Sequence, residues 1–389
     1  MHLTKHVFLA IGCLLLFAGN ALAQEEPRRN SAKGNYLFTI EKEIDATPVE
    51  DQGQSSTCWS FSTLSFLESE LMRMGKGQHD FSEMYIVRQT YIAKAELYVR
   101  MHGQMNFGAG GAFHDVPQMI ARYGLIPEAA YPGLAPDDAG HNHGEMDAVL
   151  KSIVDAVVEA PNKTLSTRWR DAFAAVLDAY LGPAPQTFEY QGKTYTPRSF
   201  AESLGIDTDD FVEITSYTHH PYYEQFVMEV PDNWNFSRIH NVPLDELTQI
   251  IDHALANDYT VAWAADVSEK TFSYQNGVAV VPATDWFEMS AAERDALFYE
   301  PKPERTITAA LRQAAFDDYS TTDDHGMHIV GSARDQQGNK YYIVKNSWGQ
   351  SNYCQGYLYV SEAYVRYKTM DILVNRAGIP KDIGKKMGL

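Results

Sequence analysis

The chain has 389 residues, 44% of them hydrophobic, which is enough for one large domain or two lobes with substantial cores. Its formal net charge of −19 argues against nucleic acid and anionic membranes as partners, because both bind to basic protein surfaces. The charge gives no indication of a catalytic activity.

The first 23 residues have the composition of a secretory signal peptide. They combine one lysine and no acidic residue with a long apolar core and a small-x-small end at Ala21-Leu22-Ala23. They predict cleavage before Gln24 and an exported protein, periplasmic or secreted. A lipoprotein box around Cys13 is a weaker interpretation, because too little apolar sequence precedes that cysteine. No later run is long and apolar enough to span a bilayer, so we expect a soluble mature chain.

Residues 51–61, with the sequence DQGQSSTCWSF, place Cys58 at the start of a predicted helix. Small polar residues before it could cap the helix, and apolar residues then recur every three or four positions over residues 58–75. In the first turn of a helix the unpaired N–H groups and the dipole favour a thiolate, the nucleophile of acyl transfer. The alternative is a small hydrophobic cysteine in the core. Loss of the signal peptide leaves Cys58 and Cys354, which could form one disulfide, whereas a nucleophilic Cys58 has to stay free.

Hydrophobic periodicity, glycines and prolines divide the rest of the chain into short predicted elements. In the N-terminal half the expected segments are an extended leader (24–50), helices (82–102, 114–123 and within 147–181), a glycine-rich stretch (106–113), and short strands with aromatic-rich loops (186–242). In the C-terminal half they are a helix (244–255), strands (259–263 and 356–360), an amphipathic stretch (285–316), a closing segment (361–375) and a short basic tail (378–389).

Two groups of polar residues are candidate metal sites. His141 and His143 alternate with two acidic residues and could bind a metal if the segment were extended. Acidic residues and histidines in a solvated loop more often bind none, so we predict neither a metal nor another cofactor. His219 and His220 form the second group, where the aromatic residues around them favour packing or cleft lining. The chain contains neither H-E-x-x-H nor G-x-S-x-G, so a zinc peptidase or a serine hydrolase has no motif here.

The C-terminal half carries a predicted β-hairpin with a histidine and an asparagine near its two ends. Apolar runs at 329–333 and 341–344 flank a turn centred on Gln337. His328 lies nine residues before Gln337 and Asn346 lies nine after it. Positions equidistant from a turn pair across an antiparallel ladder, so we expect the two side chains to be neighbours. A histidine oriented by an asparagine is the base of a Cys–His–Asn site, although such a histidine could also be a satisfied core residue.

These motifs resemble those of the papain-like cysteine peptidases. Cys-Trp-Ser-Phe at 58–61 and Asn-Ser-Trp-Gly at 346–349 match two hallmarks of that family. Gln52 stands six residues before the cysteine, the position of the glutamine that binds the oxyanion in the family. There are two departures from the pattern: Ser56 replaces a usual glycine, and Ser55 replaces the disulfide cysteine of secreted members.

The resemblance implies a set of site residues. The implied catalytic residues are Cys58, His328, Asn346 and Gln52, and the implied substrate-binding residues are Gly110, Gly111 and Trp348. In the family a Gly-Gly pair lines the cleft and pairs with the substrate backbone, and the tryptophan shields the histidine–asparagine hydrogen bond from water. An ordinary turn is the alternative for the two glycines. A phosphate-binding loop is a poor one, because the strand, the spacing and the third glycine are missing.

Residues 241–268 resemble more narrowly the bleomycin hydrolase and aminopeptidase C branch of that family. The 270 residues between Cys58 and His328 exceed the ~130–150 that are usual in papain-like enzymes, as the helical insertion of that branch requires. The implied fold class is α+β, with a helical lobe, an antiparallel β-barrel-like lobe and a helical insertion. The implied divisions are a signal peptide (1–23), a leader and helical lobe with the nucleophile helix (24–135), the insertion (136–242), the β lobe with the histidine and asparagine (243–375) and a C-terminal tail (376–389).

We therefore expect an exported cysteine peptidase that hydrolyses peptide bonds through a thioester, and an aminopeptidase in particular. In the resembled branch the C-terminus blocks the cleft, so that only a substrate with a free N-terminus fits, whereas here the tail could equally be a disordered basic terminus. An endopeptidase with an open cleft, a transpeptidase and a catalytically silent peptide-binding protein remain open alternatives. The expected partners are peptide substrates, and the sequence leaves open whether the chain forms a homo-oligomer.

Overall fold

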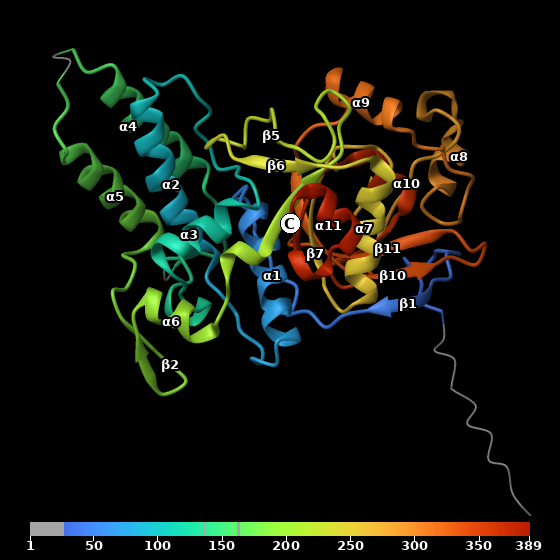
Figure 1. Ribbon diagram of the computed structural model, residues 1–389, viewed down its shortest axis with the longest axis horizontal. Coiled ribbons are helices and arrows are strands. Elements are labelled where there is room, and N and C mark those ends of the chain that lie inside the picture. The colour runs from blue at the N-terminus through green and yellow to red at the C-terminus, as the bar shows by residue number, and fades with distance from the viewer. Residues whose placement is uncertain (1–26, 136, 162–163) are drawn as a thin grey trace, which may run out of the picture.

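The computed structural model describes residues 27–389 apart from residues 136 and 162–163. The predicted signal peptide, residues 1–23, lies outside the described residues. Figure 1 shows two regions, with helices α2 to α6 on one side and a large β-sheet on the other, and with α1 between them. This arrangement confirms the predicted α+β class.

Helix α1 (Cys58–Arg73) is buried along most of its length. Its apolar residues Leu64, Leu67 and Leu71 are fully buried in the core that the helical region shares. Its polar residues Ser65 and Glu68 are buried as well, since the sheet covers the other side of the helix. The predicted apolar stripe is present, and the burial of the opposite face is what the periodicity alone does not indicate.

The other helices of this region pack around α1 and α2. Ser82 caps α2, because its hydroxyl accepts a hydrogen bond from the backbone N–H of Tyr85 at 3.0 Å. Apolar residues of α4 and α5, including Leu150, Phe173 and Leu177, belong to the same core as α1. The bounds are α2 (Glu83–Arg100), α3 (Asp115–Tyr123), α4 (Gly144–Val158), α5 (Arg168–Leu181) and α6 (Pro197–Leu204), with a small hairpin of β2 (Phe188–Tyr190) and β3 (Lys193–Tyr195).

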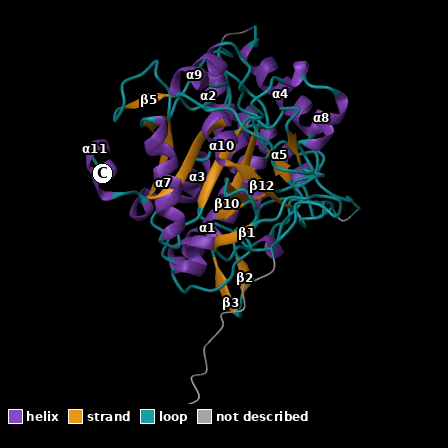
Figure 2. Cartoon of the chain, turned by 90° about the vertical axis from the view of Figure 1, so that its right-hand side faces the viewer, coloured by secondary structure: helices purple, strands orange, loops and turns teal. Residues whose placement is uncertain are grey.

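The sheet is built from strands in both halves of the chain. Its strands are β1 (Thr39–Glu43), β4 (Phe211–Thr215), β5 (Gln225–Val227), β6 (Arg238–Asn241), β7 (Val261–Ala265), β8 (Phe272–Ser273), β9 (Val278–Ala279), β10 (His325–Arg334), β11 (Lys340–Lys345), β12 (Tyr357–Ser361) and β13 (Thr369–Asn375). They follow the order β5-β6-β4-β13-β7-β10-β11-β12-β9-β8, with β1 against β10, and only the pairs β4–β6 and β9–β12 are parallel among those described. Figure 2 shows the strands in the interior with helices around them.

Strands β10 and β11 form the predicted hairpin, but their register differs from the predicted one. Near the turn the pairing is symmetric, and it then shifts by one residue between Ile329 and Gly331. As a result His328 pairs with Lys345 rather than with Asn346, and the prediction that His328 and Asn346 are cross-strand neighbours is wrong. A β-bulge adds one residue to one strand, and a slip of one residue sends a side chain to the other face.

The C-terminal tail is a helix that packs on the outside of the sheet region, beside α7 (Figures 1 and 2). Ile383 and Met387 are buried in the core that contains α7, and Lys386 forms an ion pair with Glu246 at 2.6 Å. The tail is therefore neither disordered nor part of the cavity that contains Cys58, which corrects both interpretations of it. The remaining bounds are α7 (Leu244–Ala256), α8 (Ala291–Ala296), α9 (Ala309–Asp317), α10 (Glu362–Lys368) and α11 (Lys381–Met387). Among the described helices, none has the length and apolarity needed to cross a membrane.

Candidate active site

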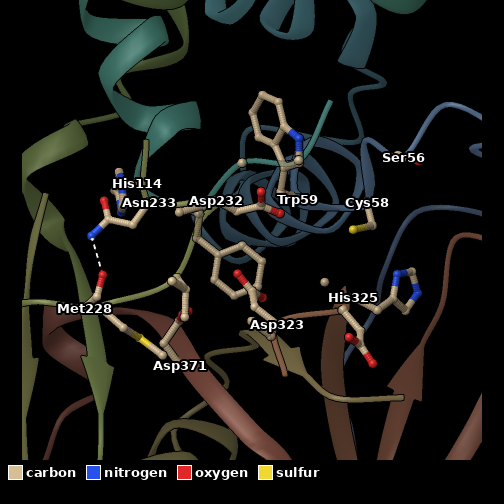
Figure 3. A pocket seen from close by; sticks show the side chains of 18 of the residues that line it. Ser56, Cys58, Trp59, His114, Met228, Asp232, Asn233, Asp323, His325 and Asp371 are labelled. Atoms are coloured by element: carbon tan, nitrogen blue, oxygen red, sulfur yellow. Dashed lines mark hydrogen bonds between the residues drawn. The ribbon is translucent and has the colours of Figure 1, made fainter. Parts of the chain in front are cut away.

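A cavity of about 300 Å³ lies where the start of α1 meets the sheet. Cys58 occupies the first position of α1 and lines this cavity. Figure 3 shows its sulfur on the same side of the cavity as the ring of His325, the first residue of β10. The lining also includes the predicted residues Gln52, Gly110, Gly111 and Trp348.

The asparagine holds His325, and His328 is not its partner. The Nε2 of His325 lies 2.7 Å from the Oδ1 of Asn346, so Nε2–H donates to the amide oxygen and Nδ1 is the ring nitrogen left for Cys58. The same oxygen accepts the backbone N–H of Ser347 at 2.7 Å, which fixes the orientation of the amide. The indole of Trp348 stacks on the imidazole, with ring centroids 4.6 Å apart and planes inclined by 26°. The tryptophan thus covers one face of the ring.

His328, the histidine that the sequence analysis selected, does not line the cavity that contains Cys58. Its ring is 1% exposed, and its Nδ1 lies 3.0 Å from the hydroxyl of Ser65 in α1. Burial and the nearby Lys345 lower the pKa of His328 well below its usual value, so the ring is neutral. Residues an odd number of positions apart on a strand point to opposite faces, which separates His325 from His328. The two histidines can be distinguished only once the bulge in β10 is known.

Gln52 is oriented as a hydrogen-bond donor to the cavity. Its Oε1 accepts the hydroxyl of Ser347 at 2.7 Å, and its backbone N–H donates to the carbonyl of the same residue at 2.9 Å. With the oxygen of the side-chain amide engaged, the Nε2 amide remains to donate to a substrate. The backbone N–H of Cys58, in the first turn of α1, is the second donor at this place.

Gly110 and Gly111 line the cavity in positions that only glycine can occupy without displacing a neighbour. A Cβ at Gly110 would lie 2.0 Å from the Oδ2 of Asp232, and one at Gly111 would lie 2.9 Å from the indole of Trp59. The ammonium of Lys94 donates to the carbonyl of Gly110 and holds this segment against α2. Both glycines therefore lie in the cavity lining at places that leave no room for a side chain.

The two departures from the papain-like pattern have local explanations. Ser56 has a φ of 55°, in the left-handed region, where a residue with a Cβ costs roughly 1–2 kcal/mol and glycine costs nothing. The serine adopts the conformation for which a glycine is suited. Ser55 places its hydroxyl 2.5 Å from that of Thr57, and both described cysteines, Cys58 and Cys354, are free thiols.

Burial opposes charge on Cys58 and on His325 alike. It raises the pKa of the Cys58 thiol to about 12, and the backbone N–H of Gly326 acts in the opposite direction. It lowers the pKa of His325 to about 4, opposed by the hydrogen bond to Asn346. A thiolate therefore depends on an imidazolium beside it, since the mutual attraction of the two charges offsets their desolvation.

The two predicted metal candidates lie outside this cavity. His220 and His219 place their Nε2 atoms 2.7 Å and 3.1 Å from the two carboxylate oxygens of Glu229, and all three ligand atoms lie within 4.8 Å of one another. This group could hold a metal, although Glu229 already satisfies both rings. The rings of His141 and His143 lie 5.7 Å apart, and both nitrogens of His143 are buried without a partner among the described residues.

The sequence analysis missed a group of carboxylates in the lining. Asp232 and Asp323 line the cavity near Cys58, and Figure 3 shows Asp371 farther along it. They come from a loop after β5, a loop before β10 and the strand β13, so no sequence motif connects them. We refer to Asp232, Asp323 and Asp371 as the acidic wall.

Comparison with known proteins gives matches along nearly the whole chain. The model of the peptidase C1-like family matches residues 18–388. Aminopeptidase W of Lactobacillus delbrueckii subsp. lactis is 24% identical over 400 residues, which cover 91% of this chain and 86% of that protein. Aminopeptidase E of Lactobacillus helveticus is 22% identical over 382 residues, covering 86% and 82%. The crystal structure of PepW from Lactobacillus rhamnosis HN001 superposes with a TM-score of 0.68 at 19% identity, covering 90% of this chain and 84% of that one.

Proposed function

We propose that this chain, which belongs to the peptidase C1-like family and is a cysteine peptidase of papain-like fold, acts as an aminopeptidase through Cys58, His325 and Asn346. The observation that carries the proposal is the hydrogen bond from His325 to Asn346 beside the cavity that Cys58 lines. The names of the relatives, aminopeptidases W and E, support the removal of N-terminal residues.

In the proposed reaction the Nδ1 of His325 takes the proton of the Cys58 thiol while the sulfur attacks the carbonyl carbon of the peptide bond. The oxyanion that forms accepts hydrogen bonds from Gln52 and from the backbone N–H of Cys58, and losing one such donor costs roughly 2.7–4 kcal/mol of barrier. His325 gives the proton to the leaving amine, and a thioester remains. His325 then takes a proton from water, which attacks the thioester, releases the carboxylic acid and restores the thiol.

Three further groups support this reaction. Asn346 keeps the imidazole in the orientation that presents Nδ1 to the sulfur, and Trp348 covers the ring. In the proposal the backbone of Gly110 and Gly111, which lines the cavity, pairs with an extended substrate as an added strand would.

The test compares two fluorogenic peptide amides under reducing conditions, one with a free N-terminus and one acetylated. We expect the wild-type protein to cleave the free amide and Cys58→Ala to cleave neither, while Cys354→Ala, the matched loss of the other described thiol, keeps its activity. No cleavage by the wild-type protein would contradict the proposal and favour a silent peptide-binding protein. Residual turnover by Cys58→Ala at the wild-type rate would exclude the thioester route.

The position of the tail favours an endopeptidase as the second candidate. The C-terminal helix α11 packs near α7, and no residue of it lines the cavity. A cleft that the tail does not block has room for a chain that continues beyond the scissile bond. Cleavage of the acetylated amide as efficiently as of the free one would select this candidate.

We also propose that the protein is exported, with residues 1–23 as a cleaved signal peptide. The support is the lysine, the apolar core and the small-x-small end of that segment. Fractionation of the producing cells and N-terminal sequencing test this proposal. A mature chain that begins at Gln24 outside the cytoplasm is the expected result, and an intact Met1 in the cytoplasmic fraction would contradict it.

A further inference from the structure

The acidic wall contains one buried carboxylate oxygen without a partner among the described residues, on Asp371, beside the half-buried Asp232 and Asp323. The Oδ1 of Asp371 is buried and accepts no hydrogen bond from any residue that the structure describes, although only 7% of this residue is exposed. A β-bulge between Thr369 and Ile372 interrupts the pairing of β13 with β7 around Asp371, which lines the cavity. A buried charge without a partner is unfavourable, and such groups are retained where a ligand completes them.

The other two carboxylates of the lining have partners of their own. Glu213 lies 2.6 Å from the Nδ1 of His114. Burial opposes protonation of His114, but the carboxylate of Glu213 outweighs it and raises the pKa of this histidine to about 9. Asp324 accepts the backbone N–H of Ser268 at 3.1 Å and the hydroxyl of Thr322 at 2.7 Å. Both residues therefore already accept hydrogen bonds from the protein.

The cations that act on the acidic wall are His114, Arg312 and Lys94, and none of them forms an ion pair with its carboxylates within 4.0 Å among the described residues. Arg312 acts on Asp371 through space, but its guanidinium donates to the backbone carbonyl of Ser216 at 2.7 Å and forms no ion pair within 4.0 Å among the described residues. Lys94 acts on Asp232 in the same way, and its ammonium donates to the carbonyl oxygens of the glycine segment. No described cation therefore compensates the carboxylates of the wall at ion-pair distance.

The neighbouring carboxylates also affect one another. Burial, followed by Asp232, raises the pKa of Asp323 to about 7. Burial and Glu213 raise the pKa of Asp371 well above its usual range. Asp323 and Asp371 therefore tend to keep their protons while no cation is beside them. A positively charged group that entered the cavity would favour their ionised forms.

The acidic wall lies next to the glycine segment that the proposed function pairs with substrate. Asp232 is directly beside Gly110, since a Cβ on that glycine would meet its carboxylate, and Gly110 belongs to the segment placed to pair with substrate. Asp323 and Asp232 are also the two carboxylates that raise the pKa of Cys58. Figure 3 shows Asp232 and Asp323 between Cys58 and Asp371. The lining also includes apolar residues, Phe113, Met228, Val230, Ile239 and Ala264, together with the polar His114 and Asn233.

We propose that Asp232, Asp323 and Asp371 form the binding site for a protonated amine of the substrate, foremost the α-ammonium group at its N-terminus. This inference rests on the proposed aminopeptidase function and deepens it. An ammonium group offers three N–H donors and one positive charge, and the wall offers acceptors and the opposite charge. Side-chain carboxylates of the cavity, and not the C-terminus of the chain, would then select substrates with a free N-terminus.

The test measures binding, so that its result does not depend on turnover. The Cys58→Ala protein is titrated by calorimetry with the peptide amides Ala-Phe-Ala, acetyl-Ala-Phe-Ala and acetyl-Ala-Lys-Ala at neutral pH. We expect the free peptide to bind at least tenfold more tightly than its acetylated form. Asp323→Asn and Asp371→Asn, each combined with Cys58→Ala, should lower the affinity for the free peptide by about tenfold to a hundredfold, the usual range for a lost charge-assisted hydrogen bond. The affinity for the acetylated peptide should stay within about threefold.

Asp209→Asn is the matched control, because it removes one exposed carboxylate that does not line the cavity and should leave the affinity for each peptide unchanged. Tight binding of acetyl-Ala-Lys-Ala that the same two variants weaken would support an ammonium site whose amine comes from a lysine side chain. Equal affinities for the free and acetylated peptides, with no preference for lysine, would overturn the inference. So would a free-peptide affinity that both Asp323→Asn and Asp371→Asn leave unchanged. If the peptides bind as expected but the wild-type protein cleaves none of them, the proposed peptidase function would be contradicted and the ammonium site would stand.

Discussion

Two of the places where the protein buries carboxylates, the sheet side of helix α1 and the acidic wall, differ in whether the carboxylate oxygens have partners. Behind α1, Glu68 accepts the hydroxyl of Thr47 at 2.5 Å and the backbone N–H of Phe81 at 2.9 Å, and Lys345 donates to the same threonine at 3.0 Å. In the wall, the Oδ1 of Asp371 is buried without any described partner.

Burial has the same effect on the acids of both places. It raises the pKa of Glu68 to about 8 and that of Asp323 to about 7. Neither burial nor a raised pKa therefore distinguishes a carboxylate that holds the fold from one that awaits a ligand. Hydrogen bonding does, because a satisfied group contributes to folding whereas an unsatisfied one costs free energy until something binds it. We call Thr47, Ser65, Glu68, His328 and Lys345 the lysine cluster.

Substitutions of the two histidines of β10 are expected to give the largest difference in kcat. His325 serves the cavity, and His328 belongs to the lysine cluster through Ser65. We expect His325→Ala to lower kcat by roughly 10⁴-fold, as the loss of an acid–base group in a catalytic unit does, and His328→Gln to leave kcat within a few-fold while lowering the melting temperature. Steady-state kinetics and thermal unfolding of both variants check this. Equal losses of kcat in the two variants would contradict the assignment of His325.

The lysine of the cluster should be essential for stability. Lys345 donates to Ser65 at 2.7 Å and is the cation that acts on Glu68. Removing it leaves buried carboxylates uncompensated, so we expect Lys345→Met to lower the free energy of unfolding by roughly 3–5 kcal/mol. Lys193→Met, at an exposed position of β3, is the control and should change it by less than about 0.5 kcal/mol. Urea titration measures both, and similar values for the two would show that the cluster carries little stability.

The acidic wall should behave in the opposite way, because its charges oppose folding. The pKa of Asp323 is raised from 3.8 to about 7, so the folded state keeps a proton that the unfolded state has released. Its contribution to stability is present below pH 4 and is lost as the pH rises towards 7. Asp323→Asn should therefore raise the free energy of unfolding by roughly 1–2 kcal/mol at pH 8 and leave it nearly unchanged at pH 4. Chemical unfolding of the variant and the wild-type protein at the two pH values measures this change in free energy. Destabilisation of the variant at pH 8 would indicate that the Asp323 carboxylate makes favourable hydrogen bonds in the folded state.

Local patterns were sufficient for much of the fold and for the candidate site apart from its histidine and the acidic wall. The apolar period of residues 58–75 predicted α1, and the runs on either side of Gln337 predicted the β10–β11 hairpin. Family-like motifs led to Gln52 and Cys58, and the structure places both at one cavity. These features depend on neighbours in the chain, and helices and hairpins are set largely by such neighbours.

What the sequence by itself determined about this protein is therefore the class of its chemistry, through a cysteine at a helix start and the family-like motifs that accompany it. Only the tertiary structure decided which histidine joins that cysteine, because a bulge in β10 shifts the register by one residue and no local signal marks it. The tertiary structure alone also brought Asp232, Asp323 and Asp371 to one wall. Their meeting depends on strand pairings and loops far apart in the chain, and such long-range contacts leave no periodicity in the sequence.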